Sequence, residues 1–155
     1  MEKLEDAPIY FYRKNEPFGF MSNFYPSPIT IDGKHYSTVE HYFQSQKFVG
    51  NAHELEIIKA AKPVEAFRLG QSREFPIRKN WEEVKDEVIY RGLHAKYTQI
   101  EELKKLLLDT KDRKLVEHTT NDKYWADGGG NGKGKNRLGE LSMRLRTELR
   151  KPLNS

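Results

Sequence analysis

Five glycines fall within the seven positions from Gly128 to Gly134 of this 155-residue chain. Glycine loses more backbone freedom on folding than any other residue, so this density disfavours a regular helix or strand. We therefore predict a loop between Asp127 and Asn136. Leucines recur after it at three- and four-residue spacing, which predicts an amphipathic helix. These leucines are Leu138, Leu141, Leu145 and Leu149.

The glycine-rich loop has two interpretations, and the sequence leaves both open. Its backbone N–H groups could hold a phosphate, assisted by Lys133, Lys135, Arg137 and the dipole of the following helix. It could equally be a mobile surface connection. It lacks the glycine spacing and the Lys-Ser or Lys-Thr pair of a P-loop, and it does not match a dinucleotide-binding fingerprint.

The N-terminal third has the composition of short strands and loops. Residues 9–12 alternate weakly and are aromatic, which is typical of a strand. Asp32-Gly33 separates two short extended runs, at 29–31 and 34–36, and this arrangement predicts a hairpin because both residues tolerate positive φ.

Helices are predicted for most of the remaining chain. Ser37-Thr38-Val39-Glu40 fits a capping box, which would start a helix at Ser37, continue it to about Val49 and give Glu40 a structural role. Residues 115–119 fit either a strand or the end of a helix. The other predicted helices cover residues 52–61, 63–70, 80–97 (with Asn80 as its cap) and 100–108. We expect an α+β fold, a mostly helical single domain of residues 1–155 with its core at about 9–149 and a small N-terminal β-hairpin or sheet.

The chain contains no cysteine, which excludes disulfides, thiolate metal sites and cysteine nucleophiles and suits a reducing compartment. The first thirty residues lack a signal-peptide pattern, and no apolar run approaches the ~20 residues of a membrane span. We therefore expect a cytoplasmic protein. Its 27 basic and 23 acidic residues give a net charge of +4. That charge suits phosphorylated substrates or nucleic acid, but also an ordinary surface of mixed charge.

A polar cluster is predicted on the helix that follows the hairpin. Glu40, Gln44 and Lys47 share one helical face, where a carboxylate, an amide and an amine could enter one pocket between walls made by Phe43 and Phe48. The structural alternative is that Glu40 only caps the helix and Lys47 faces water.

Two aromatic segments could bind a nucleobase. Asp122 and Asp127 flank Tyr124-Trp125, so an aromatic ring could stack on a base while a carboxylate meets a sugar hydroxyl or a water. Trp81 follows Arg78-Lys79-Asn80, where it could stack on a base beside two cations. In each segment the alternative is an aromatic anchor for the core. The five histidines lack metal-ligand spacing, and no serine lies in a nucleophile-elbow context, so no metal site is predicted.

Several of these segments together resemble the motifs of the NADAR superfamily, also called YbiA-like proteins. The resemblance covers about residues 9–149. Its motifs are FGFMSNF at 18–24, TVEHYFQSQKF at 38–48, RKNW at 78–81 and a last, longer motif at 115–139.

The resemblance implies an N-glycosidase that needs no cofactor. Members cleave the base–ribose bond of phosphorylated ribosylaminopyrimidine intermediates of riboflavin biosynthesis, and others remove ADP-ribose from guanine in nucleic acid. The family's functional positions fall on Glu40, Trp81 and an aspartate of the last motif. We favour Asp127 over Asp122 there because Asp127 adjoins the glycine-rich loop. Our other candidates for substrate binding are Asn23, Gln44, Asp122, Trp125, Gly128, Gly129, Lys135, Asn136 and Arg137.

The chemistry agrees with these residue types. Cleavage of an N-glycoside develops positive charge on the ribose, which a carboxylate such as Glu40 would stabilise. Lys47 is a further catalytic candidate, since its amine could contact the sugar or capture the opened sugar as an imine. The pocket is expected between the Glu40 helix, the Trp81 helix start and the glycine-rich loop. A non-catalytic nucleotide- or ADP-ribose-binding module is the alternative of another class, and the oligomeric state stays open.

Overall fold

The computed structural model describes residues 6–151. The chain divides into two compact units, one comprising Asn23–Ile100 and the other comprising Met1–Ser22 together with Glu101–Ser155. Within the described residues the elements are six α-helices, one short 3₁₀ helix and two sheets of two strands each. The predicted fold class, α+β and mostly helical, is confirmed.

The unit of residues 23–100 begins with the predicted hairpin. Strands β2 (Ile29–Ile31) and β3 (Lys34–Tyr36) pair antiparallel, with Ile29 opposite Tyr36. Asp32 and Gly33 have φ values of 51° and 80°, so both turn residues are left-handed as the Asp-Gly sequence predicts.

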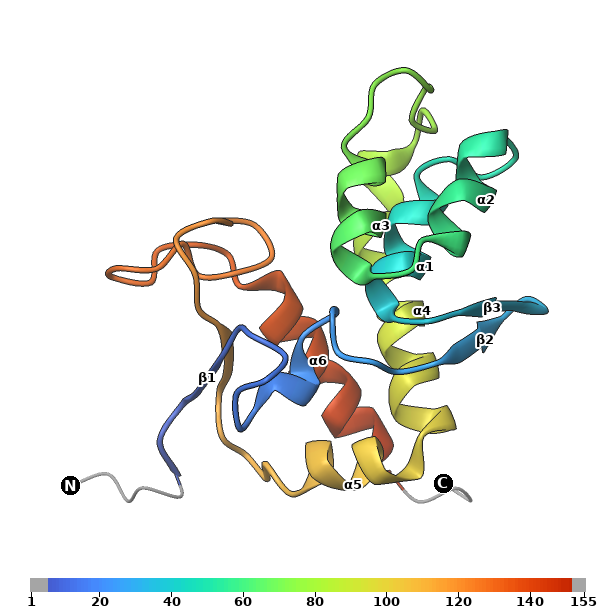
Figure 1. Ribbon diagram of the computed structural model, residues 1–155. Coiled ribbons are helices and arrows are strands. Elements are labelled where there is room, and N and C mark those ends of the chain that lie inside the picture. Colours follow the sequence, from blue (N-terminus) through green and yellow to red (C-terminus); the bar gives the residue numbers. More distant parts are fainter. Residues whose placement is uncertain (1–5, 152–155) are drawn as a thin grey trace. The chain divides into compact units, whose positions relative to one another are not determined.

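Four helices complete this unit: α1 (Val39–Gln46), α2 (Ala52–Lys59), α3 (Pro63–Gly70) and α4 (Trp81–Gln99). Helix α1 packs against the other three, and α1, α2 and α3 lie side by side in Figure 1. Between α1, α2 and α3 lies a buried cluster formed by Phe48, Ile57 and Ala66. Packing against three helices thus fixes α1, the helix that bears Glu40 and Gln44.

The capping-box prediction for α1 is wrong in register. The N-cap is Thr38, whose side chain accepts a hydrogen bond from the His41 backbone N–H, rather than Ser37. The helix also ends at Gln46, short of the predicted Val49, and Lys47 is its C-cap. Glu40 therefore lies one residue before the capping-box position, which His41 occupies.

Helix α4 continues through Gly92, as predicted, and reaches Gln99. A Cβ at Gly92 would lie 3.0 Å from the Tyr42 ring and 3.1 Å from Val39, so the glycine allows α4 to approach α1 closely. Asn80 is the N-cap of α4, but its side chain makes no capping hydrogen bond. Its Oδ1 accepts instead from the Arg78 guanidinium, at 2.9 Å.

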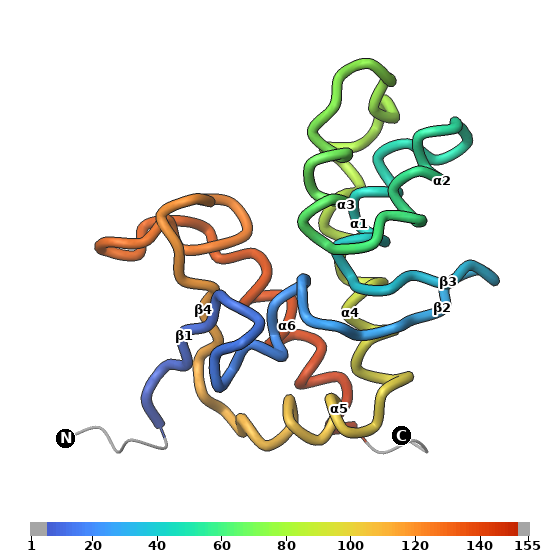
Figure 2. Tube along the Cα trace, viewed as in Figure 1, coloured from blue at the N-terminus to red at the C-terminus, as the bar shows by residue number. Residues whose placement is uncertain are grey.

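The other unit is built on a parallel strand pair. Strand β1 (Ile9–Phe11) pairs with β4 (Leu115–Glu117), with Ile9 opposite Leu115, so residues 115–117 form a strand rather than a helix end. Figure 2 shows these two segments side by side, although about a hundred residues separate them in the sequence.

Helix α6 (Arg137–Leu149) packs against β4 in the same unit, and α5 (Glu101–Leu108) packs against α6. Leu138, Leu141 and Leu145 are buried, as the leucine spacing predicts. A short 3₁₀ helix at Gly19–Met21 completes the described elements of this unit. Among residues 6–151, no helix combines the length and the apolar character that a membrane crossing requires.

Candidate active site

Glu40 and Gln44 meet on one face of α1. The Gln44 Nε2 donates to Glu40 Oε2 at 2.7 Å, and both residues are buried, with exposed fractions of 3% and 6%. The Glu40 backbone N–H donates to the carbonyl oxygen of Asn23 at 3.1 Å, so the chain at Asn23 adjoins the same point of the helix. Asn23, Glu40 and Gln44, all predicted site residues, are therefore neighbours.

Gly70 at the end of α3 makes room for this arrangement. A Cβ at Gly70 would lie 1.9 Å from Gln44 Oε1 and 2.6 Å from its Cδ. The Gln44 amide therefore fits against α3 only because residue 70 has no side chain, and its position then directs Nε2 toward Glu40.

Lys47 joins the group from the end of α1. It is 8% exposed, its Nζ lies 3.4 Å from the Gly70 carbonyl oxygen and 5.9 Å from the centre of the Phe43 ring. Burial lowers the pKa of Lys47 from 10.5 to about 8, and the negative charge of Glu40 opposes part of that shift. A fraction of the amine is therefore neutral near neutral pH, as a nucleophilic lysine requires.

Trp81 opens α4 and contacts Phe43 of α1. The two ring centres are 5.1 Å apart at an interplanar angle of 53°, and the tryptophan is 7% exposed. Phe43 thus lies between Trp81 and Lys47, and its role as the wall of a pocket stays a prediction. Phe48, the second predicted wall, lies instead in the buried cluster with Ile57 and Ala66. Most of the Trp81 surface is already covered by the protein, which leaves little of the ring for a base. Its role in stacking on a base stays a prediction.

Asp127 is fixed by hydrogen bonds in the other unit. Its Oδ1 accepts from the backbone N–H groups of Gly129 at 2.8 Å and Thr119 at 3.2 Å, and its Oδ2 lies 2.6 Å from His118 Nδ1. Burial raises the pKa of Asp127, but the hydrogen bonds from His118, Gly129 and Thr119 outweigh burial and lower it overall. Asp127 is therefore ionised at neutral pH and organises the start of the loop.

Asp122 has a different role in the same segment. Its Oδ1 accepts from the backbone N–H groups of Tyr124 and Trp125, both at 2.8 Å, which is an Asx-type turn. The Tyr124 and Trp125 rings meet edge to face, with centres 4.7 Å apart. The segment is thus an ordered turn that presents a half-buried tryptophan.

Hydrogen bonds within its own unit hold both ends of the glycine-rich loop, and the two interpretations of the loop stay predictions. Gly128, Gly129, Gly130 and Gly132 all have positive φ. At the start of α6, the N–H groups of Arg137 and Leu138 donate to the carbonyl oxygens of Tyr124 and Trp125.

These bonds use N–H groups that were expected to hold a phosphate. Gly128, Gly134 and Lys135 also donate within the unit. A phosphate would therefore depend chiefly on the side chains of Lys133, Lys135 and Arg137. The Lys135 Nζ lies 5.3 Å from the centre of the Tyr124 ring.

Asn136 carries structural hydrogen bonds that the sequence did not indicate. Its side-chain Nδ2 donates to the Leu115 carbonyl oxygen at 3.0 Å, and its Oδ1 accepts from the Glu117 N–H at 2.9 Å. Asn136 has a left-handed backbone with φ of 51°. The predicted substrate-binding residue therefore ties the loop to β4.

Comparison with known proteins decides the family. A family model described as "NADAR domain" matches residues 10–150. The chain belongs to the NADAR family. It is 51% identical to the N-glycosidase YbiA of Escherichia coli (strain K12) over 94% of this chain and 91% of that protein. The NMR structure of the E. coli protein YbiA has a TM-score of 0.86 to this chain at 50% identity, covering 95% of this chain and 87% of that one.

A longer relative points to a pathway. A riboflavin biosynthesis protein of Vibrio vulnificus (strain YJ016) is 38% identical over 94% of this chain, and the matched part is 40% of that protein. The chain is a YbiA-like N-glycosidase, which confirms the enzyme class that the resemblance implied and sets aside the non-catalytic binding module. Such an enzyme acts on a nucleoside-type substrate.

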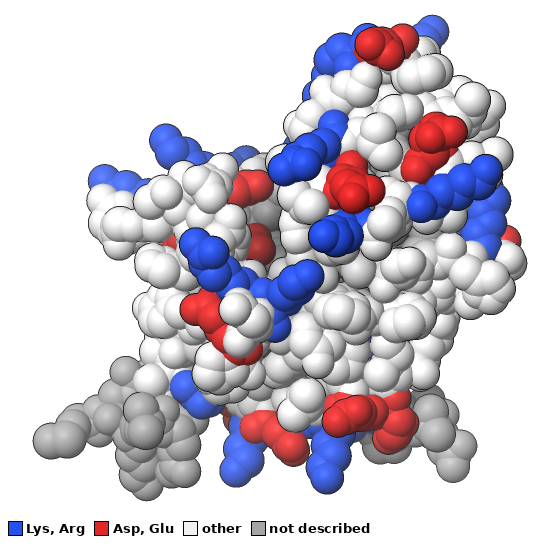
Figure 3. All heavy atoms as spheres, viewed as in Figure 1, with Lys and Arg blue, Asp and Glu red and all other residues white. Residues whose placement is uncertain are grey.

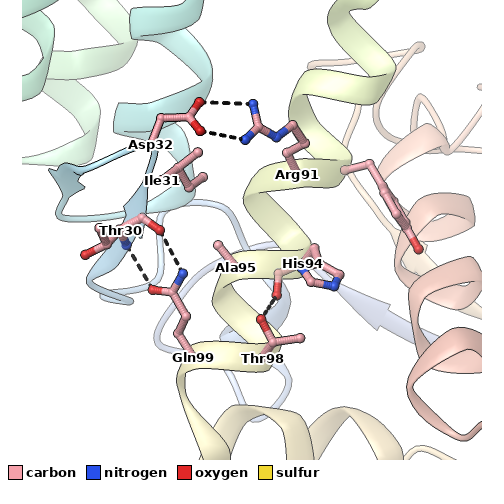
Figure 4. A pocket seen from close by; sticks show the side chains of 9 residues that line it. Thr30, Ile31, Asp32, Arg91, His94, Ala95, Thr98 and Gln99 are labelled. Atoms are coloured by element: carbon pink, nitrogen blue, oxygen red, sulfur yellow. Dashed lines mark hydrogen bonds and ion pairs between the residues drawn. The ribbon is translucent and has the colours of Figure 1, made fainter. Parts of the chain in front are cut away.

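An open groove of about 470 Å³ lies elsewhere in the unit of residues 23–100, between β2 and α4. Figure 4 shows that polar pairs link its two sides: Arg91 meets Asp32 at 3.2 Å, and the Gln99 amide bonds to both backbone groups of Thr30. None of the predicted site residues lines it. We interpret this groove as the junction of the hairpin with α4.

The two groups of predicted site residues belong to different units. Glu40, Gln44, Lys47 and Trp81 lie in one unit, whereas Asp122, Asp127 and the loop lie in the other. The predicted pocket that would combine them stays a prediction. His118 is the residue that sequence reasoning missed as a site candidate, because its link to Asp127 depends on the folded loop. No group of histidine and carboxylate side chains in residues 6–151 has the arrangement of a metal site.

Proposed function

We propose that this enzyme hydrolyses the base–ribose N-glycosidic bond of phosphorylated ribosylaminopyrimidines, the early intermediates of riboflavin biosynthesis. One observation carries the proposal. Asn23 and Gln44, both predicted to bind substrate, each hold a buried amide oxygen that has no hydrogen-bond partner among the described residues. Buried polar atoms are rarely left unsatisfied, and an aminopyrimidine ribotide offers N–H and O–H donors in number.

Glu40 supports this proposal by its place beside the two amides. It adjoins Asn23 through its backbone and Gln44 through its carboxylate. A buried carboxylate would stabilise the positive charge that develops on the ribose as the C–N bond breaks, and Gln44 would orient it. Water then adds to the sugar carbon, so the products are the free base and ribose 5-phosphate.

Lys47 offers a second route within the same reaction. With a pKa of about 8, roughly one amine in ten is neutral at pH 7, against roughly one in three thousand for an ordinary lysine. The neutral amine could attack the opened sugar and form an imine. Treatment with borohydride during turnover would trap that imine as a stable adduct, and absence of the adduct would exclude the route.

Removal of ADP-ribose from guanine in nucleic acid is the second candidate. The net charge of +4 favours it. However, on the face drawn in Figure 3, Lys and Arg atoms are interspersed with Asp and Glu atoms rather than forming a continuous basic stripe. Phosphate contacts dominate affinity for nucleic acid, so a mixed surface favours the free metabolite.

The test is a comparison of substrates. Purified protein is incubated with the ribosylaminopyrimidine 5'-phosphate and, separately, with DNA that carries ADP-ribosylated guanine, and free base or free ADP-ribose is measured. We expect turnover of the ribotide, slowed about 100-fold or more in Glu40→Gln. Turnover of the modified DNA alone would contradict the proposal. We further propose that residues 1–155 act as one NADAR domain, because the family match spans both compact units.

A further inference from the structure

An aromatic pair lies beside the two amides whose oxygens have no hydrogen-bond partner among residues 6–151. Phe24 directly follows Asn23 in the chain, and its ring centre is 6.5 Å from that of Phe67 on α3, at an interplanar angle of 50°. Phe67 is 42% exposed, and Phe24 is half-buried. The pair therefore keeps aromatic surface open to a ligand.

Helix α3 places this pair next to Gln44. Phe67 and Gly70 are three residues apart, so they share one face of the helix. Gly70 abuts the Gln44 amide, because a Cβ at residue 70 would lie 1.9 Å from Gln44 Oε1. The Asn23 carbonyl oxygen in turn accepts from the Glu40 backbone N–H at 3.1 Å. The two rings and the two amides are thus neighbours within the unit of residues 23–100.

We propose that the base of the substrate stacks on Phe67 and Phe24. The amide oxygens of Asn23 and Gln44 then accept hydrogen bonds from its amino groups. The inference rests on the proposed function and names the residues that recognise the base. Two acceptor oxygens select a base whose edge carries N–H donors, as an aminopyrimidine does, and disfavour one that presents only carbonyl oxygens there.

The arrangement of the rings suits a flat ligand. A base that lies over the face of Phe67 meets the inclined Phe24 ring near its edge, and both offset-stacked and edge-to-face contacts are favourable between aromatic rings. Aromatic walls with a few convergent polar groups are typical of small-molecule sites. Trp81, the other candidate for stacking, is only 7% exposed and already contacts Phe43.

Support of the core does not explain Phe67. The buried cluster between α1, α2 and α3 consists of Phe48, Ile57 and Ala66, and Phe67 is not among the side chains packed against it. Single exposed apolar side chains are ordinary on protein surfaces. Phe67, however, contacts a second aromatic ring, and both lie beside buried acceptors that lack a donor.

The first test is steady-state kinetics with the ribosylaminopyrimidine 5'-phosphate. Phe67→Ala should raise KM about tenfold with little change in kcat, because stacking on the base adds to binding rather than to stabilisation of the charged ribose. Phe67→Tyr keeps the ring and should keep KM, whereas Phe67→Leu keeps only apolar surface and should not. Leu55→Ala, which removes an exposed apolar side chain of α2, is the matched control and should leave KM unchanged. An unchanged KM in Phe67→Ala, or full recovery in Phe67→Leu, overturns the proposal.

The second test does not depend on turnover. Free diaminohydroxypyrimidine is added to protein with carbon-13 in its phenylalanine rings, and the ring resonances are followed by NMR. We expect those of Phe24 and Phe67 to shift, and that of Phe75, which stacks on His53 in the same unit, to stay in place. Ribose 5-phosphate has no ring to stack and should leave both resonances unchanged. A shift at Phe43 in place of Phe24 and Phe67 would assign the base to the Trp81 side and overturn the proposal.

The outcomes separate the two claims. If the wild-type protein cleaves no ribotide, the proposed function fails, and the phenylalanine spectra still decide the inference. Unchanged Phe24 and Phe67 resonances then overturn it, whereas shifted ones support an aminopyrimidine site in this unit. If Glu40→Gln is slowed while Phe67→Ala has the KM of the wild type, the proposed function stands and the inference fails.

Discussion

The two units hold a carboxylate in opposite ways. In the unit of residues 23–100, Glu40 is oriented by another side chain, Gln44, which itself depends on the bare backbone at Gly70. In the other unit, Asp127 is oriented by the backbone N–H groups of its own loop. We therefore expect the helix to keep its shape when its carboxylate is changed, whereas the loop should depend on its carboxylate.

The two units also differ in the side-chain amides that bond to their strands. Gln99 bonds to both backbone groups of Thr30 on β2, and neither residue is a predicted site residue. The Asn136 amide bonds to the Leu115 carbonyl oxygen and the Glu117 N–H on β4, and Asn136 also lies at the end of the glycine-rich loop. In the loop unit, residues predicted for substrate binding also hold the fold, so loss of activity there is ambiguous without a measure of stability.

The largest effect is expected at Glu40. Replacing Glu40 with Gln removes the charge that would stabilise the ribose cation but keeps the size of the side chain, so kcat should fall about 100-fold or more. The melting temperature should change little, because Thr38 rather than Glu40 caps α1. Glu56→Gln, an exposed change on α2, is the control for charge alone. A Glu40→Gln variant with full activity would refute the assigned role.

The next effect concerns Gly70. Gly70→Ala places a methyl group onto the Gln44 amide, so it should destabilise the fold by about 2 kcal/mol and lower kcat about tenfold by misplacing Glu40. Chemical denaturation and steady-state kinetics measure the two effects.

The double variant Gly70→Ala/Gln44→Ala makes the test specific. Removing the Gln44 amide should recover most of the lost stability but none of the lost activity, because Glu40 then has lost Gln44 as its orienting partner. If the double variant is as unstable as the single variant, the contact with Gln44 is not the cause.

Replacing Asp127 should lower the stability of the fold, unlike replacing Glu40. Its pKa is lowered on folding, so the stability it contributes is present above the pKa of about 3.9 of an unfolded aspartate and is lost as pH falls through the lower folded value. We expect Asp127→Asn to cost about 1–2 kcal/mol at pH 7 and to lessen the acid-induced loss of stability. Asp122→Asn keeps its Oδ1 acceptor for Tyr124 and Trp125, so it should cost less. Urea denaturation between pH 2.5 and 7 compares the two variants.

The sequence predicted elements that depend on local pattern, and it missed contacts that depend on the fold. The Asp32-Gly33 turn, the spacing of Glu40 and Gln44, and the leucine face of α6 follow from neighbouring residues. The capping register of α1 was wrong because two adjacent hydroxyl residues, Ser37 and Thr38, both fit an N-cap.

The contacts of the loop could not be predicted in this way. Asp127 meets His118 nine residues away, and Asn136 meets Leu115 across 21 residues. Those pairings exist only once β4, the turn at Asp122 and the loop have folded together. Family resemblance predicted Asp127 as a site residue, but its contact with His118 became visible only in the structure.

The smallest effect is a gain in stability at Lys47. Burial lowers the pKa of this amine to about 8, so folding favours its neutral form, and the charged form costs stability below that pH. Lys47→Met keeps the length and apolar surface of the side chain, loses the attraction to Glu40 and should gain about 1 kcal/mol at pH 7.

The sign of the pH dependence tests this account. Between about pH 8 and 10.5 the unfolded lysine still binds the proton that the folded lysine has released, so wild-type stability should rise with pH in that range. Lys47→Met should lack this rise, and its advantage should shrink by pH 10. Lys59→Met, an exposed change on α2, is the control and should follow the wild type. If Lys47→Met is less stable at every pH, the attraction to Glu40 exceeds the cost of burial, and α1 holds its charges as a pair, much as the loop holds Asp127 with His118.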